Sequence, residues 1–256
     1  MKRFFRRHAT LWMLIGFCLL LGLFLSLRTG IFFTGRNLIN ILEANSFKLL
    51  LAIGMTFVIA SGGIDLSVGS ILSLSAIFTA LCMKQNIPVW LAILVGLLSG
   101  ILMGLINGAL IHFTGINAFI ITLGTSFLYR GLALIVTRGT PVSKLPAAYR
   151  AFGGGDIFQV ESGVYMALLV LLLSIPLLYK MRWGHYITTL GGNPVALRRC
   201  GVRTGAWRIS TFAVMGFLAA LAGIIISARL NSAEPNAGLN MEMDAITAVI
   251  LGGTPL

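Results

Sequence analysis

Long apolar segments, each near the length needed to cross a lipid bilayer, recur along this chain and most constrain its fold. A bilayer-spanning helix needs about 20 predominantly apolar residues. The apolar segments lie near residues 11–27, 49–61, 66–83, 88–111, 117–137, 164–181, 209–228 and 245–256. The last segment makes only about 18 Å of helix, which is too short to cross. The pattern therefore predicts an all-α, polytopic membrane helical bundle with seven spans plus an incomplete eighth.

The composition supports this interpretation and excludes a separate soluble domain. Hydrophobic residues make up 57% of the 256 residues and charged residues only 10%, whereas soluble domains hold roughly 45–50% and about 25%. The spans and their short connections use the whole chain. We therefore expect one transmembrane domain over residues 1–256, in contact with the lipid bilayer on most of its surface.

Two segments of the first third are ambiguous. The start, MKRFFRRH followed by an apolar run, resembles a signal peptide, but no small-x-small cleavage site follows Leu27, so we expect a retained first span. Segment 49–61 is short, begins after Lys48 and ends in Gly62 and Gly63. This pattern predicts a short or broken helix near 49–65, and a tilted short span with a snorkelling lysine explains it equally well.

The charge distribution predicts the orientation. The net charge is +12, and the bases cluster between apolar segments, which argues for membrane orientation and against a nucleic-acid partner. The positive-inside rule places two acid-free basic stretches in the cytoplasm, with an even number of crossings between them. They contain Lys2, Arg3, Arg6 and Arg7, and Lys180, Arg182, Arg198, Arg199, Arg203 and Arg208. The N-terminus is therefore predicted to be cytoplasmic, and loops 138–163 and 229–244 to be external.

Four glycines at intervals of four predict a helix-packing face on the 88–111 span. They are Gly96, Gly100, Gly104 and Gly108. Glycines at this spacing let another helix backbone approach closely, within the chain or between subunits. Asn107 lies beside this strip, where it either lines a polar pathway or forms an interhelix hydrogen bond.

The string GGIDLSVGS contains further candidates for a gate or a solute pathway. Gly63 permits a sharp turn, and the carboxylate of Asp65 can cap the helix that opens at Leu66, next to Ser67. Either capping alone or a mobile element beside a pathway explains these residues. Arg130 lies inside the 117–137 span, where a charge requires water, a carbonyl or an acid. Thr122 and Thr125 of the same span complete the pathway candidates, although neither can be assigned to a substrate contact.

Residues 191–201 read as a short capped helix in the basic loop. Asn193 is a good N-cap, Pro194 suits the first helical position and Gly201 suits the residue after the end. Two turns of helix are marginal in water, so the helix needs a surface to dock against. That surface is either lipid phosphate or a cytoplasmic partner that the helix couples to the membrane. The candidate coupling residues are Gly192, Asn193, Pro194, Ala196, Arg198, Arg199, Gly201 and Arg203.

The sequence contains no motif for enzymatic chemistry. It has no GxxxxGK[ST], HExxH or GxSxG. His112 and His185 have no metal-ligand spacing, and Cys18, Cys82 and Cys200 form no disulfide framework. We therefore expect no nucleotide site, no metal, no cofactor and no catalytic residues in this chain.

Four segments together resemble one family. They are GMTFVIASGGIDLSVGSILSLSA (54–76), AFIITLGTSFLYRGLALIVT (118–137), GGNPVALRRCGV (191–202) and ARLNSAEPNAGLNMEMDAITAVILGGT (228–254). The chain resembles the permease subunits of bacterial ABC importers for monosaccharides of the ribose, xylose, arabinose and galactose type. The resemblance implies a second permease subunit, usually in a homodimer, a cytoplasmic ABC ATPase and an extracytoplasmic sugar-binding protein.

The resemblance also implies roles for particular segments. Segment 191–202 matches the loop of the family that contacts the ATPase, and the external loops face the binding protein. The family continues with further spans beyond the point matching Leu256, so we expect this chain to be C-terminally truncated relative to it.

These observations favour an inner-membrane permease that imports a monosaccharide or similar small polyol by alternating access. Its energy would come from ATP bound on another subunit. Two alternatives stay open. One is a secondary transporter that uses Asp65 and Arg130 for ion coupling. The other is a non-transporting membrane scaffold, which a truncated chain could become.

Overall fold

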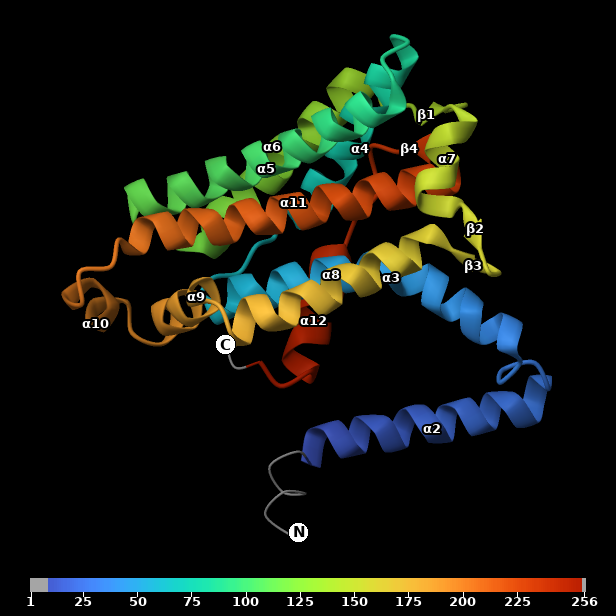
Figure 1. Ribbon diagram of the computed structural model, residues 1–256, viewed down its shortest axis with the longest axis horizontal. Helices are drawn as coiled ribbons and strands as arrows, with labels where there is room; N and C mark the ends of the chain where they lie inside the picture. The colour runs from blue at the N-terminus through green and yellow to red at the C-terminus, as the bar shows by residue number, and fades with distance from the viewer. Residues whose placement is uncertain (1–8, 255–256) are drawn as a thin grey trace.

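The computed structural model describes residues 9–254, so the predicted basic residues Lys2, Arg3, Arg6 and Arg7 lie outside the described part (Figure 1). The described chain is helical apart from two short antiparallel ribbons. In one ribbon β1 (Val142–Ser143) pairs with β4 (Ser232–Ala233), and in the other β2 (Asp156–Ile157) pairs with β3 (Val160–Glu161). The helices are α2 (Ala9–Thr29), α3 (Gly35–Ala60), α4 (Val68–Lys84), α5 (Val89–Thr114), α6 (Ala118–Thr137), α7 (Ala147–Gly154), α8 (Ser162–Tyr179), α9 (Arg182–Gly192), α10 (Pro194–Arg199), α11 (Thr204–Leu230) and α12 (Met241–Leu251).

The polytopic helical bundle predicted from the sequence is confirmed, with a different set of spans. Among residues 9–254, six helices are long and apolar enough to cross a membrane, namely α2, α3, α5, α6, α8 and α11. The apolar helix α4 has only 17 residues. The prediction of a short or broken helix near 49–65 is wrong for the helix itself, because α3 continues for 26 residues from Gly35. The first half of α3 was missed because Arg36, Glu43 and Lys48 lower its hydropathy below that of an apolar segment.

The break in the chain comes after α3 and depends on the two glycines. Gly62 has a φ of +79°, which a residue with a Cβ rarely adopts. Its N–H donates to the carbonyl of Ile59 at 2.9 Å, and the Gly63 N–H donates to that of Val58 at 3.0 Å. These two bonds form a Schellman cap. The chain then runs without regular helix through residues 63–67, and α4 starts inside the bundle.

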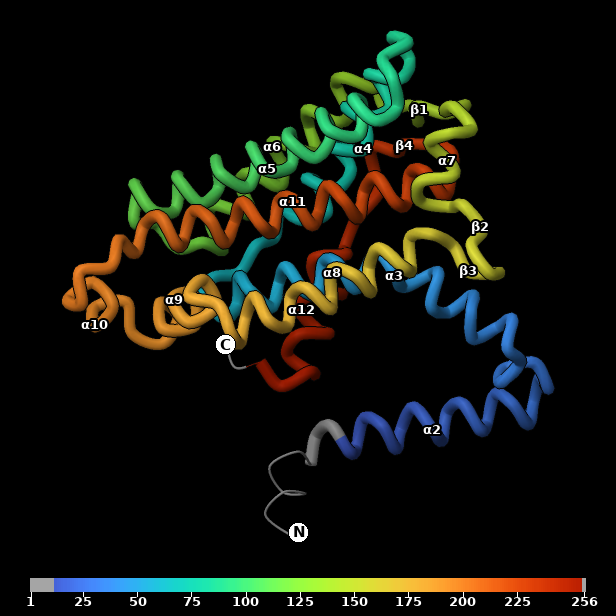
Figure 2. Tube along the Cα trace, in the orientation of Figure 1, coloured from blue at the N-terminus to red at the C-terminus, as the bar shows by residue number. Residues whose placement is uncertain are grey.

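A second irregular segment, residues 234–240, packs against the start of α4. After β4 the chain turns inward until Gly238 lies against Gly69, the second residue of α4; a Cβ on Gly238 would lie 2.9 Å from the Gly69 Cα. Figure 2 follows this path. The predicted loop 229–244 is thus partly buried, because Pro235 and Gly238 are buried while Glu234, Asn236, Leu239 and Asn240 are exposed, and residues 241–244 belong to α12. Its external side stays a prediction. Helix α12 follows with 11 residues, about 16 Å, so it does not cross alone.

The polar connections gather at two opposite ends of the bundle (Figure 1). Helix α7 and the two ribbons form one end, called here the α7 end. Helices α9 and α10 form the other, called here the α10 end. Loop 138–163 and the basic stretch 180–208 thus lie on opposite sides, as their charges predicted. Helix α2 lies apart from the other helices in this view.

An ion-paired cluster closes the α7 end. Arg229 Nε lies 2.8 Å from Glu161 Oε2, and Glu43 accepts a hydrogen bond from the Glu161 N–H at 3.1 Å. Burial raises the pKa of Glu161, and the nearby guanidinium of Arg229 opposes that rise. The cluster connects α3, β3 and α11.

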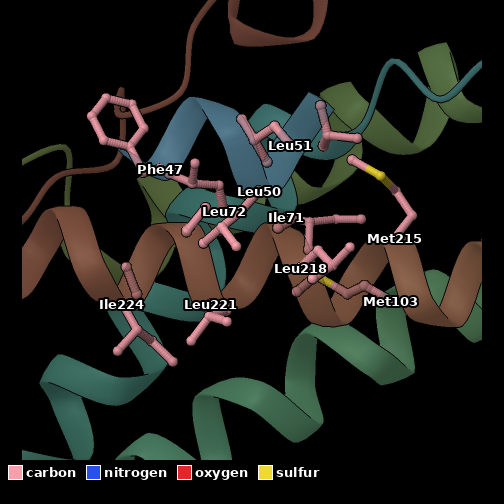
Figure 3. Packing of buried hydrophobic residues seen from close by; sticks show 14 of the residues in the cluster. Phe47, Leu50, Leu51, Ile71, Leu72, Met103, Met215, Leu218, Leu221 and Ile224 are labelled. Atoms are coloured by element: carbon pink, nitrogen blue, oxygen red, sulfur yellow. The ribbon is translucent and has the colours of Figure 1, made fainter. Parts of the chain in front are cut away.

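Helix α11 is the centre of the core. Figure 3 shows Leu50 of α3, Ile71 of α4 and Met103 of α5 around Met215 and Leu218 of α11, and all five are nearly or fully buried. Helix α11 itself has 15 buried residues along its length. Its position in the middle explains why the flanking helices can show large apolar side chains to lipid.

The four glycines of α5 lie against α11 and α4 of the same chain. An added Cβ at Gly100 would lie 2.5 Å from the Gly216 carbonyl, and one at Gly108 would lie 2.7 Å from the Ile209 Cα. A Cβ at Gly104 would overlap the carbonyl oxygen of Phe212, and one at Gly96 the hydroxyl of Thr79. The close approach is intramolecular, which the sequence alone left open.

Candidate functional site

A cluster of buried polar groups surrounds the start of α4. It consists of Asp65, Ser67, Asn107, Thr122 and Tyr129, and is called here the α4 polar cluster. The first four are 0% exposed and Tyr129 is 4% exposed. Asp65 and Ser67 come from the break between α3 and α4, Asn107 from α5, and the other two from α6.

Asp65 organises the break from within. Its Oδ1 accepts hydrogen bonds from the N–H of Ser67 at 2.8 Å and from its hydroxyl at 2.6 Å. Asn107 donates to the Ser67 Oγ at 2.7 Å. The predicted capping of the helix by Asp65 is wrong: α4 begins at Val68 and not at Leu66, and the carboxylate bonds Ser67 before the helix and no amide within it. Asn107 forms the interhelix hydrogen bond that the sequence offered as one of two readings.

Helix α6 completes the cluster. The hydroxyl of Thr122 accepts from the Leu66 N–H at 3.1 Å and donates to the Ala118 carbonyl at 2.8 Å. The Tyr129 hydroxyl lies 3.2 Å from the amide oxygen of Asn107. Buried irregular backbone must find hydrogen-bond partners within the protein, and here Thr122 of α6 accepts from the Leu66 N–H and Asp65 from the Ser67 N–H.

One oxygen of the cluster is left over. Asp65 Oδ2 is buried and has no hydrogen-bond partner among the described residues. A buried polar atom without a partner typically costs about 1–3 kcal/mol. Within the described part of the chain, this oxygen is therefore the one acceptor of the cluster that its present hydrogen bonds leave unsatisfied.

Arg130 ties the second irregular segment to the bundle. Its Nη1 donates to the carbonyl oxygens of Pro235 at 2.6 Å and Ala237 at 2.7 Å, and to the Ser73 hydroxyl at 3.0 Å. The guanidinium thus joins α6, α4 and the 234–240 segment. Bonding to carbonyls was one of the environments that the sequence predicted for this charge.

The structure brings most predicted pathway residues into these two neighbouring polar sites, but not into an open channel. Gly63 lies in the break, where its added Cβ would be 3.3 Å from Phe212. The Thr125 hydroxyl donates to the Thr122 carbonyl at 3.3 Å, within its own helix. A gating or pathway role for these residues stays a prediction.

Sequence reasoning missed three contributors. Tyr129 reads as one more large apolar residue of α6, and nothing local distinguishes it. Lys48 was interpreted only as a possible snorkelling lysine, and Asp244 was placed in an external loop. These two form an ion pair with 2.8 Å between Nζ and Oδ2. A lysine and an aspartate within apolar surroundings were the available signal, but 195 intervening residues separate them.

The capped helix predicted at 193–201 is present as α10. Asn193 Oδ1 accepts from the Ala196 N–H at 2.9 Å, Pro194 is the first helical residue, and Gly201 has a φ of +78°. Within α10 only Leu197 is buried, whereas Ala196, Arg198 and Arg199 are exposed. Gly192 and Arg203 flank the helix on either side.

We expect Thr122→Val to lower the stability of the protein and Thr125→Val to leave it nearly unchanged. The first substitution strips a buried N–H, that of Leu66, of its acceptor, at a cost of about 1–3 kcal/mol. The second removes a hydroxyl bonded only within its own helix, and should stay within roughly 0.5 kcal/mol. Thermal unfolding of the two purified variants in the same detergent measures the difference. Equal shifts in Tm would show that the bond to the break contributes nothing.

The chain is similar to known membrane transport proteins over most of its length. The family described as "Branched-chain amino acid transport system / permease component" matches residues 37–256. The ribose import permease protein RbsC of Haemophilus influenzae is 38% identical over 229 residues, covering 88% of this chain and 71% of that protein. RbsC of Bacillus subtilis is 39% identical over 243 residues, covering 92% and 76%.

A third relative is named for a different sugar. The D-allose transport system permease protein AlsC of Escherichia coli K12 is 35% identical over 252 residues, covering 98% of this chain and 76% of that protein. No solved structure matches the chain. The family match covers all of the bundle from α3 onward, including both irregular segments, and the chain is a multi-pass membrane protein. It belongs to the family of permease components of the branched-chain amino acid transport system type.

Proposed function

We propose that this chain is the membrane-spanning permease subunit of an ATP-driven importer for a monosaccharide or a similar small polyol. The observation that supports this proposal is the 35–39% sequence identity, over most of the chain, to permeases named for ribose and D-allose transport. The family description names branched-chain amino acids, but it covers permeases more broadly than these individual relatives do. Solute would cross by alternating access.

We further propose that the α10 end faces the cytoplasm. All six bases of residues 180–208 belong to this end, with no acidic residue among them. Such an excess of lysine and arginine favours the cytoplasmic side of a bacterial inner membrane. The α7 end, with Asp156 and Glu161, would then be extracytoplasmic and would receive solute from a sugar-binding protein.

The proposed partners are a second permease subunit, in a homodimer, and a cytoplasmic ABC ATPase. The chain itself has no phosphate-binding loop, so ATP must act through another protein. Helix α10 offers the contact: Val195 is 57% exposed and lies on the helix that carries Arg198 and Arg199. An exposed apolar side chain flanked by arginines at the end of a membrane protein fits a protein partner better than bulk water.

A short physical route connects this helix with the α4 polar cluster. Gly191, near the end of α9, lies against the turn after α3: a Cβ there would lie 2.9 Å from the Gly62 nitrogen and would overlap the Ala60 carbonyl oxygen. Only two residues separate Gly191 from Pro194. Displacement of α10 would therefore press directly on the turn that leads into Asp65, as a coupled two-state transition requires.

We expect the double variant Arg198→Glu, Arg199→Glu to lose ATPase association and ATP-driven ribose uptake by at least tenfold. Reversing both charges opposes any acidic groove that receives α10. Co-purification of the ATPase and uptake of radiolabelled ribose into cells measure the two losses. Arg150→Glu, an exposed arginine of α7 at the opposite end, should leave ATPase association unchanged. If the double variant still binds the ATPase like the wild type, the coupling assignment is wrong.

A further inference from the structure

The ion pair between Lys48 and Asp244 lies at an unusual depth. Lys48 is the fourteenth of the 26 residues of α3, about 20 Å from either end of the helix. Glu43 of the α7-end cluster lies only five residues, about 8 Å of helix, before it, so the pair lies inside a hydrocarbon layer about 30 Å thick but nearer the α7 end than the middle. The side chains are nevertheless 43% and 54% exposed. A half-exposed charge at this depth is strongly unfavourable against lipid and is typically found facing water or protein.

The pair lies in a groove between α3 and α12 whose volume is about 540 Å³. Its walls combine the polar side chains of Asn45 and Thr247 with alanines and with larger apolar side chains, which are Leu49, Leu51, Met241 and Leu251. The exposed surfaces of the other long helices are different. Leu102 of α5, Phe127 of α6 and Leu172 of α8 are 57%, 72% and 65% exposed, as expected for lipid-facing helices.

A separate hollow lies further along α3, toward the α10 end. This second hollow begins at Thr56, one helical turn after Ala52, and has a volume of about 640 Å³. It is lined further by Gly62, Thr188 and Gly191, and by Gly252–Thr254 directly after α12. From Asn45 to Gly62 the two hollows follow α3 for about 25 Å. The end nearest α10 is thus lined by Gly62 and Gly191, the two residues that contact each other between the turn after α3 and the helix preceding α10.

We propose that the α3–α12 groove forms one wall of a water-filled passage for a small polyhydroxylated solute, with the Lys48–Asp244 pair as the solute-contacting group. The lysine donates hydrogen bonds, the aspartate accepts them, and Asn45 and Thr247 do both. Because the two charges neutralise each other, the site suits an uncharged solute rich in hydroxyls more than an anion or a cation. This inference rests on the proposed function.

Cysteine accessibility tests the water-filled groove. Cys18, Cys82 and Cys200 are first replaced by serine, and the chain is produced in cells together with its partner subunits. Thr247→Cys is then compared with Leu102→Cys, which is the fourteenth of 26 residues in α5 and so matches Lys48 in depth. We expect a charged, membrane-impermeant methanethiosulfonate to label Thr247→Cys at least tenfold faster in inside-out vesicles. Rates within threefold of each other would overturn the hydrated groove.

Charge exchange tests the contact with solute. Lys48→Met and Asp244→Asn should each reduce ribose uptake at least tenfold. The exchanged pair, Lys48→Asp with Asp244→Lys, should restore the amount of folded chain in the membrane and leave uptake at least tenfold low, because donor and acceptor have traded places. Full recovery of uptake would mean that the ion pair only holds α3 and α12 together, and it would overturn the proposal.

A failure of the proposed function looks different. Wild-type cells would then take up leucine and not ribose or D-allose, while the labelling contrast between Thr247→Cys and Leu102→Cys would persist. The accessibility result therefore judges the groove independently of the solute.

Discussion

The variant Gly104→Leu is expected to yield no folded, monodisperse protein. Gly104 faces α11 so closely that a single added carbon would overlap the Phe212 carbonyl and lie 3.1 Å from the Ala213 Cα. Both are backbone atoms, which cannot rotate away as a side chain can. A leucine must push α5 and α11 apart, and the neighbouring Gly100 and Gly108 would lose their contacts as well. Overpacking of one site typically costs about 1–3 kcal/mol, and here one substitution separates a whole helix pair.

Size-exclusion chromatography in detergent and thermal unfolding measure this loss. The matched control is Gly124→Leu on α6, where nothing lies within 4 Å of an added Cβ. This variant should elute and unfold like the wild type. A graded pair, Gly104→Ala and Gly124→Ala, should show a lowered Tm only for the first. Equal behaviour at the two glycines would mean that α5 and α11 are not packed as described.

The features that could be predicted from the sequence are those that depend on local chemistry. The caps of α10 require only Asn193, Pro194 and Gly201, all within nine residues, and the helix begins and ends accordingly. The turn after α3 likewise needs only Gly62 and Gly63. The glycine strip of α5 predicted a close helix contact, but the periodicity of one helix says nothing about which neighbour it meets.

The features that escaped prediction depend on contacts between distant segments. Residues 234–240 are polar and rich in turn-forming types, which is typical of an external loop. Pro235 and Gly238 are nevertheless buried, because Gly238 fits against Gly69 and Arg130 bonds the carbonyls of Pro235 and Ala237. The first half of α3 was missed for the opposite reason: its polar residues face protein, a groove or the α7 end, so hydropathy undercounts it. Asp65, Asn107 and Thr122 were each identified, but their common hydrogen-bond network was not.

Arg130→Met is expected to release the 234–240 segment together with α12. The methionine keeps an unbranched apolar stem but is shorter and has no donors, and it leaves the carbonyls of Pro235 and Ala237 without the guanidinium. Hydrogen bonds to a charged group contribute about 1.5–3 kcal/mol each, so losing both costs more than the net stability of a small helix such as α12. Since α12 carries Asp244, the variant should also lose the ion pair to Lys48.

Amide hydrogen exchange of the purified protein in detergent measures this release directly. In Arg130→Met, peptides covering 234–251 should exchange at least tenfold faster, while peptides of α5 and α11 keep their protection. Arg150→Met, at an exposed position on α7, is the control and should exchange like the wild type throughout.

The third contact of the guanidinium, with Ser73, distinguishes the bond of Arg130 to α4 from its bonds to the carbonyls of the 234–240 segment. Ser73→Ala removes only the hydroxyl on α4 and should accelerate exchange of 234–251 less than threefold. If Ser73→Ala and Arg130→Met had equal effects, α4 would hold the segment and the carbonyl bonds would be incidental. A large effect confined to Arg130→Met would instead show that the bonds from Arg130 to the carbonyls of Pro235 and Ala237 hold the 234–240 segment. That segment in turn positions α12.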